Sequence, residues 1–375
     1  MENLVVVNAR FLTQPITGTQ RFAIELCREL KKLLPNLVLI APNNIIHPDI
    51  AKELNVQVVG KIRKGIIWEQ IELPIILRRY GNPLLINLCN LAPIFYSNNL
   101  VSILDLSFHL HPEWFSTKFS TLYNFFIPRA AIRAKRVITI SNSSKNDIVK
   151  YFGVPQSEID IVYPSVSNNF LNPPPLSSLN PYGKYVLAVS SIDPRKNFIG
   201  LIRAFKACNL MDTKLVIVGS EHKVFADSNI KEEVGGNKQI VFTGYIQDSE
   251  LVELYQHALV FAYPSFFEGF GIPPLEAMAC GCPTLVSNTT SLPEVCGEAS
   301  VYVDPYDTIS IRDGLLSILS NDQMRTELIR RGYEQISKFN WHQSAMKLAD
   351  IIRRIDRTER PIEVPSVFKS SESKL

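Results

Sequence analysis

The sequence predicts an α/β protein built from two doubly wound parallel sheets. The chain has 375 residues, which exceeds the size at which one hydrophobic core keeps growing. Short apolar runs alternate with helical patterns in both halves of the chain. Between the halves, the proline-rich stretch Leu171 to Pro181 suits neither a helix nor a central strand. Two similar domains joined by a linker are therefore expected.

In the first half, short apolar runs indicate strands at 4–8, 37–41, 56–59, 84–88, 101–104 and 136–140. Gln20 to Leu33 has apolar residues at helical spacing, which predicts an amphipathic crossover helix. A strand followed by a helix and another strand implies parallel pairing with right-handed crossovers. The first half is therefore expected to form one doubly wound sheet.

The second half repeats this alternation, and two sheets imply two domains. Strands are expected at 185–189, 214–218, 239–242, 259–263 and 284–286, and helices at 198–208 and 249–258. The predicted organisation is a first domain over 1–170, a linker over 171–182, a second domain over 183–340, a helix over 341–358 and a disordered polar tail over 359–375.

Composition excludes several classes of protein. A net charge of +3 and a pI near 8.4 do not argue for a nucleic-acid partner. The six cysteines lack the CxxC and histidine spacing of zinc sites, so they are expected to be buried thiols in a reducing compartment. Neither a signal-peptide pattern nor a run of 18 apolar residues occurs. These features predict a cytosolic enzyme.

Basic residues gather on an otherwise apolar stretch at Arg129, Arg133, Lys135 and Arg136. One interpretation is a surface that contacts an anionic membrane or a lipid-linked acceptor. The other is a helix with one solvated basic face.

The stretch from Pro264 to Gly281 carries the most informative pattern in the chain. Glu268 and Glu276 bracket a Gly-Phe-Gly turn that follows an apolar strand. Glycine lets the backbone approach a ligand closely. The turn feeds a short helix whose start exposes unpaired amides and the positive end of a dipole, which favours an anion.

Helix signals within this stretch agree with that interpretation. Pro273 or Pro274 suits the first helical position, where no amide hydrogen is needed, and Gly281 is the expected stop. Glu276 is then expected in the first turn of the helix. The two carboxylates suit the two ends of a ligand whose middle is a diphosphate.

This stretch resembles the signature of the retaining glycosyltransferases of family four. The resemblance implies the GT-B fold, in which two Rossmann-like domains enclose an interdomain cleft, and a last helix that crosses back to the first domain. It also implies that Glu268 contacts the donor sugar and that Glu276 holds the ribose hydroxyls. Gly269, Phe270 and Gly271 would then line the donor site.

A second motif follows a strand and precedes a helix, from Ser191 to Phe198. We assign Lys196 and Arg195 to the diphosphate, because fixed cations stabilise the charge that develops on a leaving phosphate. Family members usually carry the arginine several positions earlier, where this chain has Ser190 or Ser191. The alternative for both cations is a salt bridge at the helix start.

Two further loops match glycine positions of the family. Gly18 lies between the first strand and the first helix, where the resemblance implies a loop near the diphosphate and acceptor, and Arg21 adds a potential phosphate contact. Gly244 follows another strand, and the loop of Gly244, Tyr245 and Ile246 would lie against the nucleobase. Backbone recognition leaves no side-chain pattern from which the base can be inferred.

Leu104 is the main departure from the family pattern. Relatives usually carry a histidine here that reaches toward the donor sugar, often its 6-hydroxyl. A leucine would leave that hydroxyl unsatisfied at a cost of about 1–3 kcal/mol. Four explanations stay open: a 6-deoxyhexose or pentose donor, replacement by His109 or His111 beyond Asp105, weak or absent transfer, and a tolerated loss.

The predicted activity is transfer of a sugar from a nucleotide-sugar co-substrate to a hydroxyl acceptor with retention of configuration, in polysaccharide or glycoconjugate assembly. The acceptor would be a carbohydrate or lipid-linked. No Asp-x-Asp pair occurs, so neither a metal nor another cofactor is expected. The expected location is the cytoplasm, with peripheral contact to the inner face of the membrane. The alternatives are a transferase-derived nucleotide-sugar-binding protein and a nucleotide-sugar epimerase.

Overall fold

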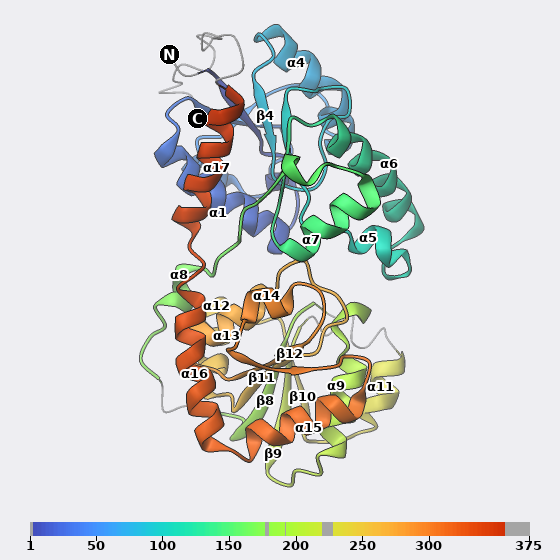
Figure 1. The fold of residues 1–375 in the computed structure, drawn as a ribbon, viewed down its shortest axis with the longest axis vertical. Coiled ribbons are helices and arrows are strands. Elements are labelled where there is room, and N and C mark those ends of the chain that lie inside the picture. The colour runs from blue at the N-terminus through green and yellow to red at the C-terminus, as the bar shows by residue number, and fades with distance from the viewer. Residues whose placement is uncertain (1–2, 177–179, 192, 220–227, 357–375) are drawn as a thin grey trace. The chain divides into compact units, whose positions relative to one another are not determined.

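The computed structural model describes residues 3–176, 180–191, 193–219 and 228–356. The chain divides into two compact units (Figure 1). Unit 1 contains Met1–Pro164 and Trp341–Leu375, and unit 2 contains Ser165–Asn340. Each unit is built on one parallel sheet, as the sequence predicts.

Unit 1 has a seven-stranded sheet in the order β3-β2-β1-β4-β5-β6-β7. Every pairing between neighbouring strands is parallel. The strands are β1 Val5–Asn8, β2 Leu37–Ala41, β3 Gln57–Val58, β4 Leu84–Asn87, β5 Asn99–Ser102, β6 Arg136–Thr139 and β7 Ile159–Ile161. The strand order reverses between β1 and β4.

The helices of unit 1 connect these strands. They are η1 Arg10–Thr13, α1 Gly18–Leu33, α2 Pro48–Glu53, α3 Gly65–Ile67, η2 Trp68–Glu72, α4 Leu73–Arg79, α5 Ser107–Leu110, η3 Pro112–Trp114, α6 Thr117–Arg133, α7 Asn142–Asp147, η4 Ile148–Phe152, η5 Gln156–Glu158 and α17 Trp341–Asp356.

Unit 2 has a six-stranded parallel sheet in the order β10-β9-β8-β11-β12-β13. The strands are β8 Lys184–Val189, β9 Thr213–Val218, β10 Ile240–Gly244, β11 Val260–Tyr263, β12 Thr284–Ser287 and β13 Ser300–Val303. The helices are α8 Asn168–Leu171, η6 Pro194–Lys196, α9 Phe198–Ala207, α11 Ser228–Val234, α12 Asp248–His257, α13 Ile272–Ala279, α14 Leu292–Cys296, α15 Thr308–Leu319 and α16 Asp322–Ile336.

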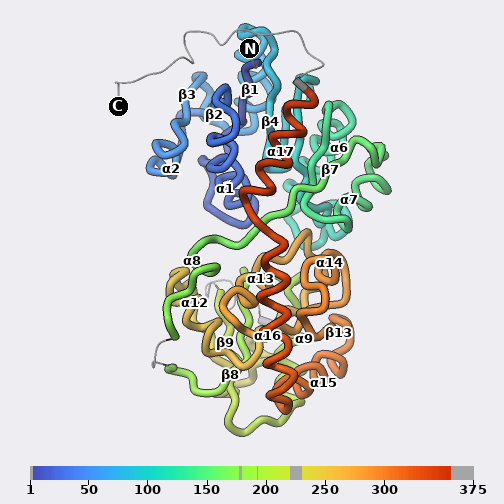
Figure 2. Tube along the Cα trace, turned by 60° about the vertical axis from the view of Figure 1, so that its left-hand side comes forward, coloured from blue at the N-terminus to red at the C-terminus, as the bar shows by residue number. Residues whose placement is uncertain are grey.

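Helix α17 lies after unit 2 in the sequence but packs on α1 of unit 1 (Figure 2). The ring centroids of Phe22 and Trp341 lie 6.1 Å apart. The Ser344 hydroxyl donates to the carbonyl of Tyr163 at 2.6 Å, and Arg353 donates to the carbonyl of Leu33 at 3.1 Å. The last described helix is therefore part of the first unit.

The boundary between the units lies at Pro164 and Ser165, earlier than the expected linker. Helix α8 packs against α12 and α13, and Gln256 donates to the carbonyl of Pro174 at 2.8 Å. The first part of the proline-rich stretch is thus attached to unit 2. Residues 177–179 of the expected linker and the predicted tail over 359–375 lie outside the described residues.

The predicted strands are present with shifts of one or two residues, but β7 and β13 were not expected. Both are edge strands. An edge strand has a neighbouring strand on one side only and is covered less completely by the core. Its residues are therefore less uniformly apolar, and the apolar run that predicts a strand is weaker. Among the described residues, no helix is both long and apolar enough to cross a bilayer.

Candidate functional site

The strand order of unit 2 reverses between β8 and β11, and the loops that follow these two strands carry both sequence motifs. In an open parallel sheet, ligands bind outside the carboxyl ends of the strands at such a reversal. Lys196 lies in η6 after β8, and Glu268 lies in the loop after β11. Sheet order therefore brings together two motifs that are far apart in the sequence.

Lys196 and Glu268 form a buried ion pair at this reversal. Nζ of Lys196 lies 2.6 Å from Oε1 of Glu268, and both side chains are 8% exposed. Nζ also donates to the hydroxyl of Tyr263 at 2.6 Å and lies 4.9 Å from the centre of the Tyr263 ring. Tyr263, at the end of β11, was not singled out in the sequence.

Glu268 is expected to be a carboxylate at neutral pH, whereas burial lowers the pKa of Lys196 from its ordinary value, an effect that the Glu268 charge opposes. Burial by itself would raise the pKa of Glu268, but the charges of Lys196 and Arg195 outweigh it and hold that pKa below its ordinary value. Burial, reinforced by the Glu268 charge, raises the pKa of Tyr263 well above its ordinary value. Tyr263 is thus a neutral hydroxyl beside the Glu268 carboxylate and the Lys196 amino group.

Arg195 takes part in a different local contact. Its Nε lies 3.7 Å from Oδ2 of Asp193, and the backbone amide of Arg195 donates to Oδ1 of the same aspartate at 3.0 Å. The helix-start salt bridge considered for both cations is therefore present for Arg195. Lys196 instead pairs across the sheet reversal with Glu268.

Asn197 connects this loop to two others. Its backbone has φ of 55°, and its side-chain oxygen accepts from the amide of Gly200 at the start of α9. Its side-chain nitrogen donates to the carbonyls of Pro264 at 3.1 Å and Pro305 at 2.7 Å. Asn197 thus joins the loops that follow β8, β11 and β13, a role that was not predicted from the sequence.

The backbone around Glu268 is held by the loop after β12. The hydroxyl of Thr290 accepts from the amide of Glu268 at 3.2 Å. The hydroxyl of Ser291 lies 2.9 Å from the carbonyl of Glu268 and 2.8 Å from that of Phe270. Thr290 and Ser291 were not predicted as site residues, although their place after a strand could have marked them.

Helix α13 begins one residue earlier than the prolines suggested. Ile272 is its first residue, and Gly271 is the N-cap with φ of 109°. A Cβ atom at Gly271 would lie 2.6 Å from a methyl carbon of Leu292, so glycine is required there for both space and conformation. Gly281 follows the end of the helix with φ of 72°, as predicted.

Glu276 is not in the first turn of α13, contrary to the prediction, because the helix begins at Ile272. Its side chain is buried, and the hydroxyl of Tyr255 lies 3.4 Å from its Oε2. Burial and the Glu276 charge raise the pKa of Tyr255 well above its ordinary value. Glu276 therefore sits on the second turn beside a neutral phenol.

The remaining predicted residues of unit 2 follow the same edge of the sheet. Ser191 is exposed after β8, and Gly244 ends β10 with φ of 75°. Tyr245 is exposed and Ile246 is half-buried in the loop that follows. Gly269 lies in the Glu268 loop, whereas the Phe270 side chain is buried against Phe339 with ring centroids 5.4 Å apart.

Two predicted residues of unit 1 lie at the start of α1. Gly18 is its first residue and Thr17 its N-cap, so the helix starts before the expected Gln20. A Cβ atom at Gly18 would meet nothing within 4 Å, so packing does not require glycine there. Arg21 is half-buried in the first turn of the helix.

Leu104 is buried, and its amide donates to the side-chain oxygen of Asn90 at 2.8 Å. Asp105 accepts from the amide and hydroxyl of Ser107 at 2.9 and 2.6 Å, which caps the turn before α5. These contacts fix the backbone where the family histidine would stand.

Both neighbouring histidines have partners of their own. His109 is hydrogen bonded to Asn124 at 2.7 Å and meets the rings of Tyr151 and Phe152 edge-on. The ring of His111 stacks on Trp114 with centroids 3.9 Å apart. Both histidines are thus held by contacts within unit 1, and their replacement of the side chain missing at Leu104 stays a prediction.

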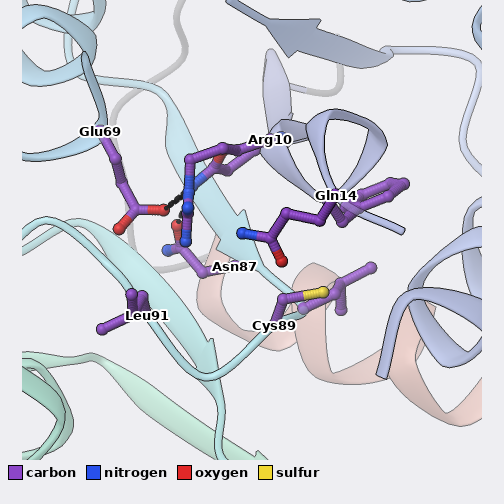
Figure 3. A pocket seen from close by; sticks show the side chains of 9 residues that line it. Arg10, Gln14, Glu69, Asn87, Cys89 and Leu91 are labelled. Carbon is purple, nitrogen blue, oxygen red and sulfur yellow. Dashed lines mark hydrogen bonds and ion pairs between the residues drawn. The ribbon is translucent and has the colours of Figure 1, made fainter. Parts of the chain in front are cut away.

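A second polar cluster lies at the strand reversal of unit 1 (Figure 3). Nε of Arg10 lies 2.6 Å from Oε2 of Glu69, and Asn8 donates to both Glu69 and Asn87 at 3.0 and 3.1 Å. The adjoining cavity has a volume of about 10 Å³, room for about one water molecule. This paired network holds the loop after β1 to η2.

Metal-ligating residues do not cluster in the described part of the chain. Across residues 3–176, 180–191, 193–219 and 228–356, no group of three or more His, Cys, Asp or Glu side chains could hold an ion. All six cysteines are free thiols.

Two family models match the chain. Residues 16–170 match the model described as glycosyltransferase family 4, and residues 177–335 match the one described as glycosyl transferases group 1. The two matches fall on the two halves of the chain that carry the two sheets.

Curated relatives include O-antigen mannosyltransferases. The O-antigen chain mannosyltransferase B of Escherichia coli is 35% identical over 220 residues, which cover 56% of this chain and 58% of the relative. The O-antigen chain mannosyltransferase RfbU of Salmonella typhimurium is 24% identical over 353 residues, which cover 90% of this chain and 96% of the relative. The chain spans 58% of mannosyltransferase B and about a third of the E. coli serotype-specific mannosyltransferase WbdA.

Solved structures show the same fold at low sequence identity. Anabaena HepE in complex with UDP and glucose has a TM-score of 0.72 at 14% identity and covers 94% of this chain and 100% of HepE. WaaG, described as involved in lipopolysaccharide biosynthesis, has a TM-score of 0.69 at 14% identity, with 93% and 99% covered. The predicted GT-B fold, with two Rossmann-like sheets, is confirmed.

Proposed function

Because the chain belongs to the glycosyltransferases of family 4 and group 1, we propose that it moves a sugar from a nucleotide-diphosphate donor to a hydroxyl of a carbohydrate or lipid-linked acceptor. O-antigen mannosyltransferases among its relatives support a role in polysaccharide assembly. The observation that carries the proposal is the buried Lys196–Glu268 pair at the strand reversal of unit 2. Ligands of such sheets bind at the carboxyl ends of the strands, and a buried cation at that edge would stabilise the negative charge of a diphosphate.

The donor would bind along the carboxyl edge of the second sheet. Lys196 would neutralise the diphosphate, whose negative charge grows as the glycosidic bond breaks. The amides at the start of α13 would add to this, since a helix N-terminus favours an anion. Glu268 would accept hydrogen bonds from the donor sugar, and Glu276 from the ribose. The amides after Gly244 would face the base.

Retention of configuration is part of the proposal. The family is thought to use front-face attack, in which the leaving phosphate takes the proton of the acceptor hydroxyl. The new glycosidic bond then forms on the face from which the phosphate departs. Positioning of the two substrates and stabilisation of the diphosphate would supply most of the acceleration. An NMR assay that resolves the anomeric proton of the first product tests this, and an inverted product contradicts it.

We propose that transfer needs no metal ion. Lys196 and the amides of α13 would neutralise the diphosphate in place of a divalent cation. Assays with a chelator and with added magnesium or manganese test this directly. Equal initial rates are expected, and activity that a chelator abolishes and magnesium restores would contradict the proposal.

The donor sugar is proposed on two competing grounds. The names of the relatives favour a mannosyl donor. The buried Leu104 favours a sugar without a 6-hydroxyl, such as a 6-deoxyhexose or pentose, because its side chain offers no hydrogen bond. A panel of nucleotide-linked mannose, glucose, rhamnose, fucose and xylose decides between them. A clear preference for a 6-hydroxylated donor removes the second idea.

The same panel tests the remaining alternatives. A transferase-derived binding protein would bind the nucleoside diphosphate but release none from any donor, with or without acceptor. A nucleotide-sugar epimerase would convert donors without an acceptor. We propose that the enzyme works in the cytoplasm at the inner face of the membrane, which its six free thiols support.

A further inference from the structure

One surface of unit 1 exposes five large apolar side chains. Two are on or beside α6 and three are near α4, and their exposed fractions run from 44% to 66%. We refer to them as the α4–α6 patch: Phe95 66%, Ile132 65%, Ile71 55%, Phe125 46% and Ile75 44%. Exposed apolar residues that gather on one surface usually mark an interaction site, whereas single ones do not.

Hydrogen bonds from arginines tie the parts of this patch together. Arg78 at the end of α4 donates to the carbonyl of Phe95 at 2.6 Å. Arg133 at the end of α6 donates to the carbonyl of Ile94 at 2.9 Å, and its guanidinium lies 5.7 Å from the centre of the Phe95 ring. The segment containing Phe95 is therefore held by both helices.

Chain topology places the two helices on one face of the sheet. Helix α4 precedes β4 and α6 precedes β6, and both crossovers run in the same direction along the strand order β3-β2-β1-β4-β5-β6-β7. Right-handed crossovers that run in one direction put their helices on the same face. Figure 1 shows both helices in unit 1.

The charged side chains on α4 and α6 themselves are all basic, and Glu72, which precedes α4, accepts from the backbone amides of Lys61 and Ile62. Neither α4 nor α6 contains an aspartate or glutamate. Arg129 and Arg133 are exposed on α6, and the guanidinium of Arg129 lies 4.0 Å from the centre of the Phe125 ring. Cations are thus placed directly beside the exposed rings, and carboxylates that would pair with them are missing from these helices.

We propose that the α4–α6 patch docks unit 1 on a bilayer that contains anionic phospholipids. Apolar side chains of a surface helix enter the boundary between head groups and acyl chains, while arginines on the same surface bind lipid phosphates. The patch offers both groups side by side. This extends the proposed function by naming the surface through which the enzyme would reach a lipid-linked acceptor.

Vesicle sedimentation of the full chain tests the proposal without donor or acceptor. Binding should be strong to phosphatidylcholine vesicles that contain phosphatidylglycerol, weak to phosphatidylcholine alone, and reduced by added salt. The double variant Arg129→Gln with Ile132→Gln should lower partitioning by about tenfold or more, since it removes one cation and one apolar anchor. Both positions are exposed, so the fold should be kept.

A matched control is available on α15 of unit 2. Ile309 is 57% exposed, and Arg312 is three residues further on, the same spacing as Arg129 and Ile132. The double variant Ile309→Gln with Arg312→Gln should bind vesicles like the unaltered chain. An equal loss in both double variants, or equal binding to neutral and anionic vesicles, would overturn the proposal.

Light scattering after size-exclusion chromatography tests whether a second copy of the chain, rather than a membrane, covers the patch. A dimer that the α6 double variant converts to a monomer would show that a second copy of the chain covers the patch, which overturns membrane docking. Donor hydrolysis by the same variant in detergent-free solution should be unchanged. Failure of vesicle binding with intact hydrolysis would therefore refute this inference and leave the proposed function standing.

Discussion

At the scale of single residues, the Lys196–Glu268 pair has the largest consequence. Both partners are buried, so removal of one leaves the other as an uncompensated charge. A bound diphosphate would offer Lys196 a second anion, and Glu268 could then turn to sugar hydroxyls. The pair would thus keep the site charged and paired before the donor arrives.

We predict that Lys196→Ala lowers the turnover number about 100- to 1000-fold, because the growing charge on the leaving diphosphate loses its cation. Steady-state kinetics with the preferred donor measures this. Lys206→Ala is the control, since Lys206 is exposed and pairs with Glu233 on the surface. Unchanged kinetics in the Lys196 variant would contradict the assignment.

Glu276→Ala should weaken binding of the nucleoside diphosphate by about tenfold or more, because a hydrogen bond to a carboxylate contributes about 1.5–3 kcal/mol. Titration calorimetry measures this. Glu268→Ala should instead affect turnover of the sugar donor more than nucleotide affinity. The same effect in both variants would argue against separate roles for the two carboxylates.

The pKa of Glu268 predicts how stability depends on pH. A carboxylate whose folded pKa is lowered adds stability above its ordinary value of 4.5, and that stability is lost as pH falls through the lowered pKa. The difference in thermal midpoint between the unaltered chain and Glu268→Gln should therefore stay constant from neutral pH to about 4.5 and shrink below it. A constant difference throughout acid pH would contradict this.

At the scale of elements, side-chain hydrogen bonds connect the loops that follow β8, β11, β12 and β13 of unit 2. Asn197 bonds the loops after β11 and β13, and Ser291 bonds the Glu268 loop from the loop after β12. The loops at the carboxyl edge of the sheet are thus hydrogen bonded to one another. A substitution of any one of these side chains should therefore loosen the neighbouring loops as well.

Asn197→Gly should lower the stability of the region around α9 by about 2–3 kcal/mol, mainly because the carbonyls of Pro264 and Pro305 lose their donor. Loss of the cap itself adds only about a few tenths of a kcal/mol, since glycine is also accepted at an N-cap. Hydrogen exchange at the amides of α9 measures this. Asn209→Gly is the matched control, since Asn209 also has positive φ, at 51°, but is exposed. An equal change in both variants would mean that backbone conformation, not the side-chain contacts, is responsible.

At the scale of the whole molecule, unit 1 is closed by a helix from the other end of the chain. Helix α17 places the half-buried Trp341 beside Phe22 of α1, and His342 lies 3.0 Å from Glu29. The first 164 residues therefore do not contain all the packing of their own unit. Folding of unit 1 should depend on the last described helix.

In a chain that ends at Asn340, unit 1 should unfold at a temperature several degrees lower than in the full chain. The reason is that removal of α17 exposes the apolar face of α1. Differential scanning calorimetry measures this. A chain that ends at Asp356 keeps the contacts of α17 and should unfold at a higher temperature than the chain that ends at Asn340. Identical scans for the two truncations would contradict the role of α17.

Local sequence determined the two sheets and the position of both motifs. Apolar runs predict strands because a buried parallel strand is apolar on both faces, and glycines at 271 and 281 mark positions where the backbone has positive φ. Glu268 and Lys196 could be named for this reason. The edge strands β7 and β13, with partly polar faces, were missed.

Tertiary structure alone decided which residues meet. Lys196 and Glu268 are 72 positions apart, and Asn197 and Pro305 are 108 apart. Their contacts arise because sheet order places β8 beside β11 and aligns the carboxyl ends of parallel strands at one edge. Likewise, α17 packs on α1 because both helices have an apolar face to bury. The spacing of apolar residues in the sequence predicts the apolar face of each helix separately. Only the folded chain shows which of these faces pack together.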